Sequence, residues 1–138
     1  MIVTEKISVG TRGRADIVDI TGQIAEKVAD SGIVNGTVTI FVSGSTAGIT
    51  TIEYESGLVA DFKALWNRIA PDNLRYEHNE RWGDGNGYAH VRASLLGCSL
   101  TVPFSERKLL LGTWQQIILV DFDNRARQRE IVVQIMGE

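Results

Sequence analysis

Apolar and polar residues alternate near the start of the chain, and this period of two predicts β-strands. The first two strands are expected over Ile2–Val9 and Ala15–Ile20. A run of β-branched residues predicts a third strand over Thr37–Val42, and Ile49–Tyr54 is typical of a fourth. The small polar segment Ser43–Thr46 lies between the third and fourth predicted strands. The first half of the chain is therefore expected to be rich in extended structure.

Apolar residues at helical spacing predict two main helices and a short one. In the first, Thr21 is the expected N-cap and Gly32 ends the apolar run. The second carries one apolar stripe, formed by Leu58, Phe62, Leu65, Trp66 and Ile69. Pro71 ends this helix, which we expect to cover one face of a sheet. The short helix is expected over Tyr88–Leu96.

The last third of the chain predicts four strands arranged as an antiparallel meander. They are expected over Ser99–Phe104, Lys108–Leu111, Gln115–Phe122 and Glu130–Met136. Strands outnumber helices, and no linker or internal repeat divides the chain. The pattern therefore predicts a single α+β domain over residues 1–138, built on one large antiparallel sheet or on two stacked sheets.

Composition excludes several classes of protein. The chain has 138 residues and a net charge of −3, which is unfavourable for binding nucleic acid. No apolar run reaches the roughly 20 residues of a membrane span, and Met1–Gly10 lacks the features of an export signal. We therefore expect a cytoplasmic protein without a membrane partner. The single Cys98 forms no intrachain disulfide, and its apolar neighbours predict a buried, inert thiol.

The polar segment Asp72–Asn86 is longer than an ordinary loop in a compact domain, which indicates a functional role. It contains His78, and His90 follows twelve positions later, with carboxylates between them. A turn over Gly83–Gly87 would bring the two histidines together. Imidazole and carboxylate groups suit zinc or a general acid–base pair. The alternative is a solvated loop histidine and a hydrogen-bonded core histidine.

Two further segments carry candidate chemistry in the first half of the chain. The hydroxyls and backbone N–H groups of Ser43–Gly48 could form an anion-binding nest, or the segment could be an ordinary turn or bulge. Glu53 and Glu55 lie on one side of the same predicted strand. Such a carboxylate pair suits Mg²⁺, although glutamates on a strand surface are the simpler interpretation.

Two segments in the second half offer contacts to a ligand. Trp114 could stack on a heteroaromatic ring while Thr113 and Gln115 donate or accept hydrogen bonds. The alternative is a bulged strand with a packed tryptophan. Asp121–Arg127 mixes acids and arginines, and the arginines could hold a phosphate. A solvated turn with local ion pairs explains that segment equally well.

These segments occur in an order that resembles the YjbQ family. The matching segments are Gly44–Glu53 (GSTAGITTIE), Tyr76–His78, Gly85–Gly97 (GNGYAHVRASLLG), Leu100–Pro103 (LTVP), Leu111–Ile117 (LGTWQQI) and Asp121–Asp123 (DFD). They are similar to the family patterns HTS-A-x-ITINE, Y-x-H, GN-x-x-AH-x-x-ASLLG, LTVP, LGTWQ-x-I and EFDGPR. The resemblance runs from about residue 15 to the C-terminus.

The resemblance implies antiparallel sheets packed as a sandwich, assembly as a homotrimer, and secondary thiamine-phosphate synthase activity. That activity would join a pyrimidine diphosphate to a thiazole phosphate and release pyrophosphate. Glu53, His78 and His90 match family positions, but Gly44 stands where the family has a histidine. The DGPR pattern is also altered, and Arg125 is the residue expected to supply its guanidinium.

Together these features predict a site at or near a subunit interface. His78, His90 and Glu53 are its candidate catalytic residues and the candidate ligands of a divalent metal, zinc or magnesium. The candidate residues for binding a small phosphorylated substrate are Ser45, Thr46, Asn86, Arg92, Thr113, Trp114, Gln115 and Arg125. The alternatives are a metal-dependent hydrolase or phosphatase at the same site and a non-catalytic trimeric module that binds a phosphorylated metabolite.

Overall fold

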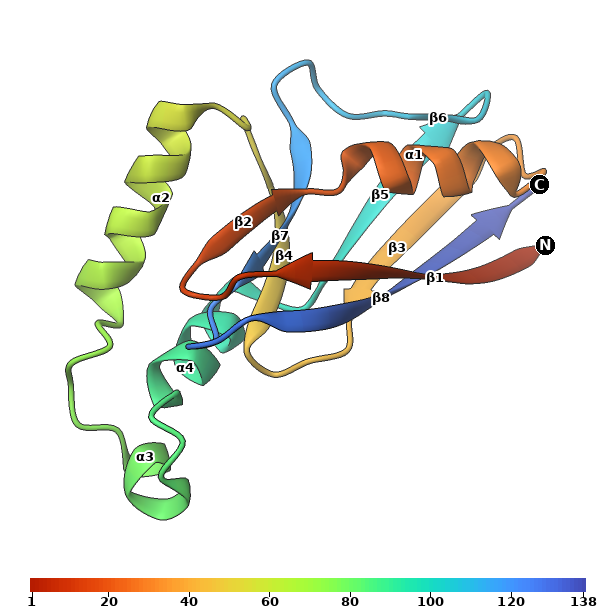
Figure 1. The fold of residues 1–138 in the computed structure, drawn as a ribbon. Coiled ribbons are helices and arrows are strands. Elements are labelled where there is room, and N and C mark those ends of the chain that lie inside the picture. Colours follow the sequence, from red (N-terminus) through yellow and green to blue (C-terminus); the bar gives the residue numbers. More distant parts are fainter.

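A computed structural model describes all 138 residues as two antiparallel sheets and four helices (Figure 1). The strands are β1 (Ile2–Thr11), β2 (Asp16–Asp19), β3 (Gly36–Val42), β4 (Ala47–Ile52), β5 (Ser99–Ser105), β6 (Lys108–Leu109), β7 (Gln116–Asp121) and β8 (Arg127–Gly137). The helices are α1 (Thr21–Asp30), α2 (Ser56–Ile69), α3 (Glu77–Trp82) and α4 (Gly87–Leu96). The α+β class predicted from the sequence is confirmed.

The strands form a five-stranded sheet in the order β1-β8-β3-β5-β6 and a three-stranded sheet in the order β2-β7-β4. The prediction of two sheets is therefore confirmed, but the C-terminal meander is wrong, since only β5 and β6 pair as neighbours in sequence. The reason lies in β7, whose residues Ile117–Val120 are all fully buried. A strand that is apolar on both faces must be covered on both faces, and the centre of the small sheet provides this.

The larger of two cores fills the space between the sheets. It is lined by the inner face of the five-stranded sheet, by Ile117 and Leu119 of β7, and by Ile24 and Val28 of α1. Helix α1 extends along the side of the two sheets (Figure 1). The alternation of the strands therefore predicts which side chains enter this core, because each strand presents every second residue to it.

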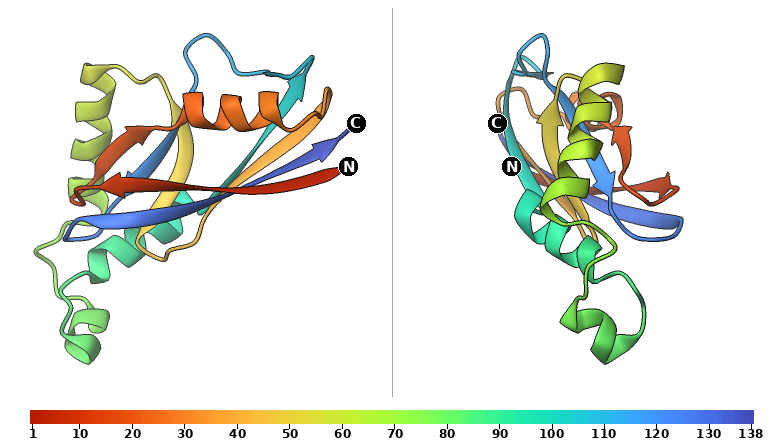
Figure 2. Two further views of the ribbon diagram at one scale, coloured as in Figure 1. Left: turned by 45° about the vertical axis from the view of Figure 1, so that its right-hand side comes forward. Right: turned by 90° about the vertical axis from the view of Figure 1, so that its left-hand side faces the viewer.

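The second core covers the outer face of the small sheet. Ile118, Val120 and Phe122 pack there against Trp66 of α2 and Ala89 of α4. The rings of Trp66 and Phe122 meet edge to face, with 4.8 Å between their centroids. Figure 2 shows α2 and α4 on this side of the molecule, with α3 projecting beyond them. The small sheet is thus the middle layer between the larger sheet and the helices.

The predicted helices form, with two differences in detail. Thr21 is the first helical residue and not an N-cap, because its hydroxyl accepts a hydrogen bond from Ile117 N–H at 2.8 Å. In α2 the expected apolar stripe is only partly covered, since Leu65 and Ile69 remain exposed. The polar segment also contains α3, which the sequence pattern does not predict. No helix has the length and apolar character needed to cross a membrane.

Candidate functional site

The two histidines lie side by side, as the predicted turn between them requires. His78 is on α3 and His90 on α4, and their ring centroids are 4.3 Å apart at an interplanar angle of 39°. Gly83 and Gly85 adopt positive φ angles of 74° and 70°, which reverse the chain between the helices. The segment is further fixed because Asn79 Oδ1 accepts a hydrogen bond of 2.8 Å from Gly87 N–H.

The environment of His90 favours the neutral imidazole. Partial burial, followed by the neighbouring His78, lowers the pKa of His90, and the opposing effect of the Asp123 and Asp84 carboxylates is smaller. His78 Nδ1 is buried and has no hydrogen-bond partner within the chain. His90 therefore offers a neutral imidazole for proton transfer, next to the unpartnered Nδ1 atom of His78.

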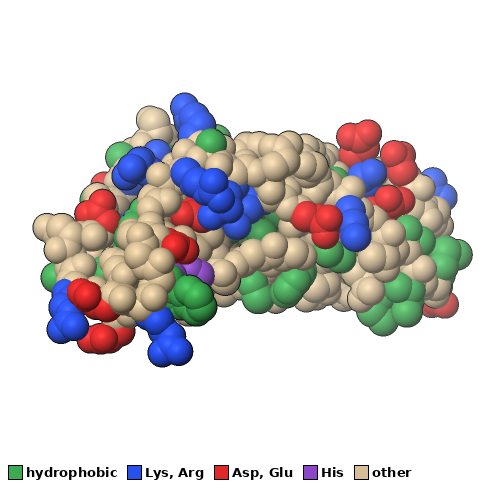
Figure 3. Space-filling model, turned by 60° about the horizontal axis from the view of Figure 1, so that its bottom comes forward, with side chains coloured by type: hydrophobic (Ala, Val, Ile, Leu, Met, Phe, Trp, Pro, Cys, Tyr) green, Lys and Arg blue, Asp and Glu red, His purple; other side chains and the backbone are tan.

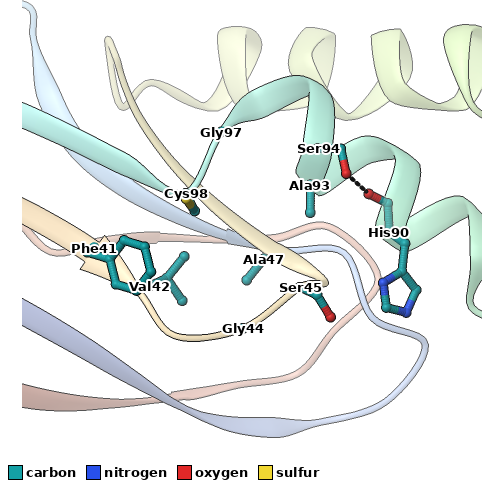
Figure 4. Close-up of a pocket in the computed structure, with 10 residues that line it drawn as sticks. All are labelled: Phe41, Val42, Gly44, Ser45, Ala47, His90, Ala93, Ser94, Gly97 and Cys98. Atoms are coloured by element: carbon teal, nitrogen blue, oxygen red, sulfur yellow. Dashed lines mark hydrogen bonds between the residues drawn. The ribbon is translucent and has the colours of Figure 1, made fainter.

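A cavity of about 440 Å³ opens beside His90. Helix α4 contributes Ala93 and Ser94 to one wall, and the end of β3 contributes Phe41 and Val42 to another. Figure 4 shows Ser45, in the β3–β4 connection, near the His90 ring at one end of this space. Figure 3, viewed from the side of α3 and α4, shows histidine surface with acidic and basic side chains close by. The cavity is thus apolar along its length and polar at the histidine end.

A buried ion pair supports this end of the cavity. Asp121, at the end of β7, is fully buried and accepts hydrogen bonds of 2.7 Å and 2.8 Å from Arg129 Nε and Nη2. Arg129 Nη2 also donates to Thr46 Oγ1 at 2.6 Å. The paired geometry satisfies a charge that would be costly to bury alone. It also fixes Thr46, the residue just before β4.

Asp123, which is also fully buried, forms a second ion pair, with the half-buried Arg127. Its carboxylate accepts hydrogen bonds from Arg127 Nε at 2.9 Å, Thr46 Oγ1 at 3.1 Å and Asn86 Nδ2 at 3.3 Å. Burial alone would raise the pKa of Asp123, but hydrogen bonds from Asn124 N–H, Asn86, Arg127 and Thr46 lower it below its usual value. Asp123 therefore stays ionised and ties the start of α4 to the sheets.

Gly44, which stands where the resemblance implies a histidine, lies directly against this network. A Cβ atom built on Gly44 would be 2.7 Å from Arg129 Nη1, closer than real contacts allow. The guanidinium thus occupies the space that any side chain at position 44 would enter. The absence of a side chain at Gly44 and the position of Arg129 are therefore coupled in this chain.

Other predicted site residues lie at the far end of the small sheet. Glu53 follows the end of β4, and Ile52 pairs there with Gln116, whereas Ala47 at the other end pairs with Asp121. A strand of this length spans about 17 Å. The exposed group Glu53, Thr113, Trp114 and Gln115 is therefore separated from the histidines within one chain. Gln115 Oε1 accepts a hydrogen bond from Gly112 N–H at 2.8 Å, and 70% of Trp114 is exposed.

Of the remaining predicted residues, Ser45, Thr46 and Asn86 lie around the histidine end, but the two arginines do not. Arg92 is buried on another face of α4, and Arg125 is exposed in the β7–β8 connection. The prediction that Cys98 is buried is wrong. It lies just before β5, where it lines the cavity, because the apolar strand next to it begins one residue later.

The residues of one chain do not fit a metal site. No group of three or more His, Cys, Asp or Glu side chains is placed to hold an ion, and Glu53 lies away from the two histidines. The zinc or magnesium site formed by His78, His90 and Glu53 thus stays a prediction that needs Glu53 from another copy of the chain.

Sequence reasoning missed Arg129, although the signal is present in the sequence. Arg129 continues the alternation of Ile131, Val133 and Ile135, which all point into the core from β8. An arginine in register with buried residues needs a buried carboxylate. Asp121 and Asp123, both fully buried, supply it, so the start of Asp121–Arg127 is not solvated, whereas Arg125 is exposed and Arg127 forms the expected local ion pair with Asp123.

The contact between Gly44 and Arg129 predicts a cost for any side chain at position 44. Gly44→Ala should lower the free energy of unfolding by about 1–3 kcal/mol, because the guanidinium is fixed by its hydrogen bonds. Gly22→Ala is the matched control, since a Cβ there meets nothing within 4 Å. It should be neutral or stabilise the chain by about 0.5 kcal/mol. Equal effects of the two changes in urea unfolding would contradict the coupling.

The lowered pKa of His90 predicts a dependence of stability on pH. As the pH falls below about 6.5, the unfolded chain takes up the proton before the folded chain does, so stability decreases. His90→Gln should make stability less dependent on pH in this range, as measured by urea unfolding. His78→Gln should move the pKa of His90 toward its usual value in an NMR titration. An unchanged His90 titration would show that the two rings do not interact.

Similarity to known proteins extends over almost the whole chain. The family described as "UPF0047 protein YjbQ-like" matches residues 5–138. A UPF0047 protein of Methanocaldococcus jannaschii is 37% identical over 134 residues, covering 96% of this chain and 94% of that protein. The UPF0047 protein YugU of Bacillus subtilis is 31% identical over 133 residues, covering 95% of this chain and 97% of that protein.

A solved structure from Sulfolobus solfataricus, described as a YbjQ-like protein of unknown function, has a TM-score of 0.95 and 38% identity. The match covers 100% of this chain and 99% of that one. The two-sheet architecture is therefore shared with that protein. This chain is a member of the YjbQ-like UPF0047 family.

Proposed function

We propose that the cavity beside His90 binds a small phosphorylated metabolite and that the histidine pair transfers a proton to or from it. The observation that carries this proposal is His90 itself, which lines the cavity, contacts the His78 ring and has a lowered pKa. An imidazole that stays neutral near pH 7 acts as a base, and it becomes an acid after taking up a proton.

The cavity has room and polarity for such a ligand. Its volume of about 440 Å³ lies in the range of small-molecule sites. The apolar walls from Phe41, Val42 and Ala93 suit a ring, and the exposed Ser45 hydroxyl and the backbone beside it suit phosphate oxygens. The phosphate would thus lie at the histidine end and the ring deeper along the cavity.

The activity that we propose to test first is thiamine-phosphate synthesis. In that reaction the bond from the pyrimidine methylene carbon to the diphosphate oxygen breaks, and the thiazole nitrogen forms a bond to the same carbon. Pyrophosphate leaves with the bonding electrons, so its developing charge needs a donor. The N–H group of the neutral His90 ring would supply that hydrogen bond, and Ser45 would hold the phosphate.

The site would be completed by another copy of the chain. Glu53, Trp114 and Gln115 lie at the opposite end of the small sheet from His90, so one chain holds two separated halves. Exposed apolar side chains accompany the second half, with 45% of Tyr54, 59% of Leu110 and 70% of Trp114 accessible. Association as a homotrimer would cover this surface and bring Glu53 and Trp114 of one copy to the His90 cavity of the next.

The synthase activity predicts a strong effect of the imidazole. With both substrates present, His90→Asn should lower the rate of pyrophosphate release by about 10²-fold or more, because a positioned proton donor contributes that much. Lys108→Gln, an exposed change on β6, is the control and should keep the full rate. Equal trace rates for the wild-type and His90→Asn proteins would rule out this activity at the cavity.

A binding module without catalysis is the second candidate, favoured by Gly44 in place of the family histidine. Calorimetric titration with thiazole phosphate, together with the activity assay, distinguishes the binding module from the synthase. Binding that His90→Asn weakens, without turnover of the substrate pair, would support the module. Turnover of a phosphate monoester alone would instead indicate a phosphatase, and metal analysis would then show whether His78, His90 and Glu53 bind an ion.

The shared site predicts a trimeric mass and complementation between variants. Light scattering should give three times the chain mass of 15.2 kDa. Proteins carrying only Glu53→Gln or only His90→Asn should be inactive, but co-expression of the two chains should restore part of the activity, because some interfaces then combine one intact half from each chain. A mass of one chain, or no restored activity in mixed trimers, would contradict sharing.

A further inference from the structure

A second cavity lies on the other side of α4 from the histidine site. It has a volume of about 150 Å³ and is lined by Arg14, Ala15, Lys63, Asn67, Asp72, Tyr88 and Arg92. Tyr88 and Arg92 are four residues apart, so they share one face of the helix, while His90 points away from it. His90 and Ser94 line the larger cavity instead. Helix α4 therefore separates two cavities with different linings.

The smaller cavity holds three cations without a paired carboxylate. Arg14, Lys63 and Arg92 come from different elements, and none of them forms an ion pair. Asp72 is the one acidic residue in the lining, so the lining carries an excess of positive charge. Elsewhere in the same chain, Arg127 and Arg129 are both paired with buried aspartates. Of the two buried arginines, Arg129 is paired with a carboxylate and Arg92 is not.

The burial of Arg92 makes the excess positive charge of this lining energetically unfavourable. Only 3% of the residue is accessible, and its protein hydrogen bonds are to the neutral acceptors Ala70 O at 2.9 Å and Asn67 Oδ1 at 3.2 Å. Its guanidinium also lies 4.9 Å from the centre of the Tyr88 ring. A buried cation with only neutral partners is unfavourable, and an anion in the adjacent cavity would offset that cost.

The backbone that brings Arg14 to the cavity is in an uncommon conformation. Arg14 and Ala15 have φ angles of 56° and 61°, and the preceding Gly13 has 78°. Such angles are costly for residues with a Cβ and are found where the surrounding structure requires them. Here Arg14 N–H donates a hydrogen bond of 2.7 Å to Asp123 O. The strained turn thus fixes Arg14 relative to the buried ion pairs.

We propose that this cavity is a binding site for a tetrahedral oxyanion, either inorganic phosphate or the phosphate group of a small monoester. Arg14 and Lys63 contact the anion from the rim, and Arg92 contacts it from the buried side. The cavity is too small for a whole nucleotide or cofactor but has room for one such group. The site is separate from the His90 cavity, so it extends the proposed function and does not depend on it.

The experiment is a calorimetric titration of the full-length protein with inorganic phosphate at constant ionic strength, with chloride as the reference anion. Saturable binding is expected for the wild-type protein. Lys63→Gln and Arg14→Gln should each weaken it by about tenfold, because each removes a charge-assisted hydrogen bond. Both residues are exposed, so these changes leave the core intact. Lys108→Gln is the matched control and should bind as the wild-type protein does.

Two further measurements show which cavity binds the anion and whether the site accepts a phosphate monoester. The phosphate binding that Lys63→Gln weakens should persist in His90→Asn, whereas any binding that only His90→Asn removes belongs to the other cavity. Methyl phosphate should compete with inorganic phosphate if the site accepts a monoester, and should fail to compete if it takes only the free ion. Binding that is lost in His90→Asn but kept in Lys63→Gln would overturn the proposal. So would the absence of saturable binding, or an equal loss in Lys108→Gln.

Discussion

The structure depends on a network of four charges at the end of β7, of which three are buried and Arg127 is half-buried. Asp121 and Asp123 pair with Arg129 and Arg127, and Thr46 lies between the two pairs. Together they connect the five-stranded sheet, the three-stranded sheet and, through Asn86, the start of α4. Removing one member of such a set leaves an unpaired buried charge, which costs about 3–5 kcal/mol. The network thus fixes the position of α4, and with it the His90 cavity and the Arg92 cavity.

From that position, helix α4 lines a cavity on each of two sides. Because Asn86 is tied to Asp123, the helix begins at a defined place on the small sheet, and Ala89 and Ala93 allow close contact with Phe122 and its neighbours. Its remaining faces then point in different directions. One presents His90 to the larger cavity, and another presents Arg92 to the smaller one. A single helix therefore gives two cavities of different chemistry without a second domain.

Much of the fold follows from the sequence, but the partners of its strands do not. The periodicity locates β1, β3 and α2 correctly, since local spacing decides whether a segment is extended or helical. It places β7 in a meander because hairpins are the commonest connection, whereas burial on both faces carries β7 into the other sheet. For the site, local spacing predicts the His78–His90 contact across a tight turn. It cannot place Glu53, whose position relative to the histidines is set by the pairing of β4 with β7.

The supply of carboxylates distinguishes two roles for the arginines of this chain. Arg127 and Arg129 have their charge neutralised by aspartates within hydrogen-bond distance, so they hold the fold together and leave little charge for a ligand. Arg92 is equally removed from water, yet its protein partners are a carbonyl, an amide oxygen and an aromatic face. The one carboxylate in the same lining, Asp72, forms no ion pair with it. An arginine retained in that state is better explained by what it binds than by what it stabilises.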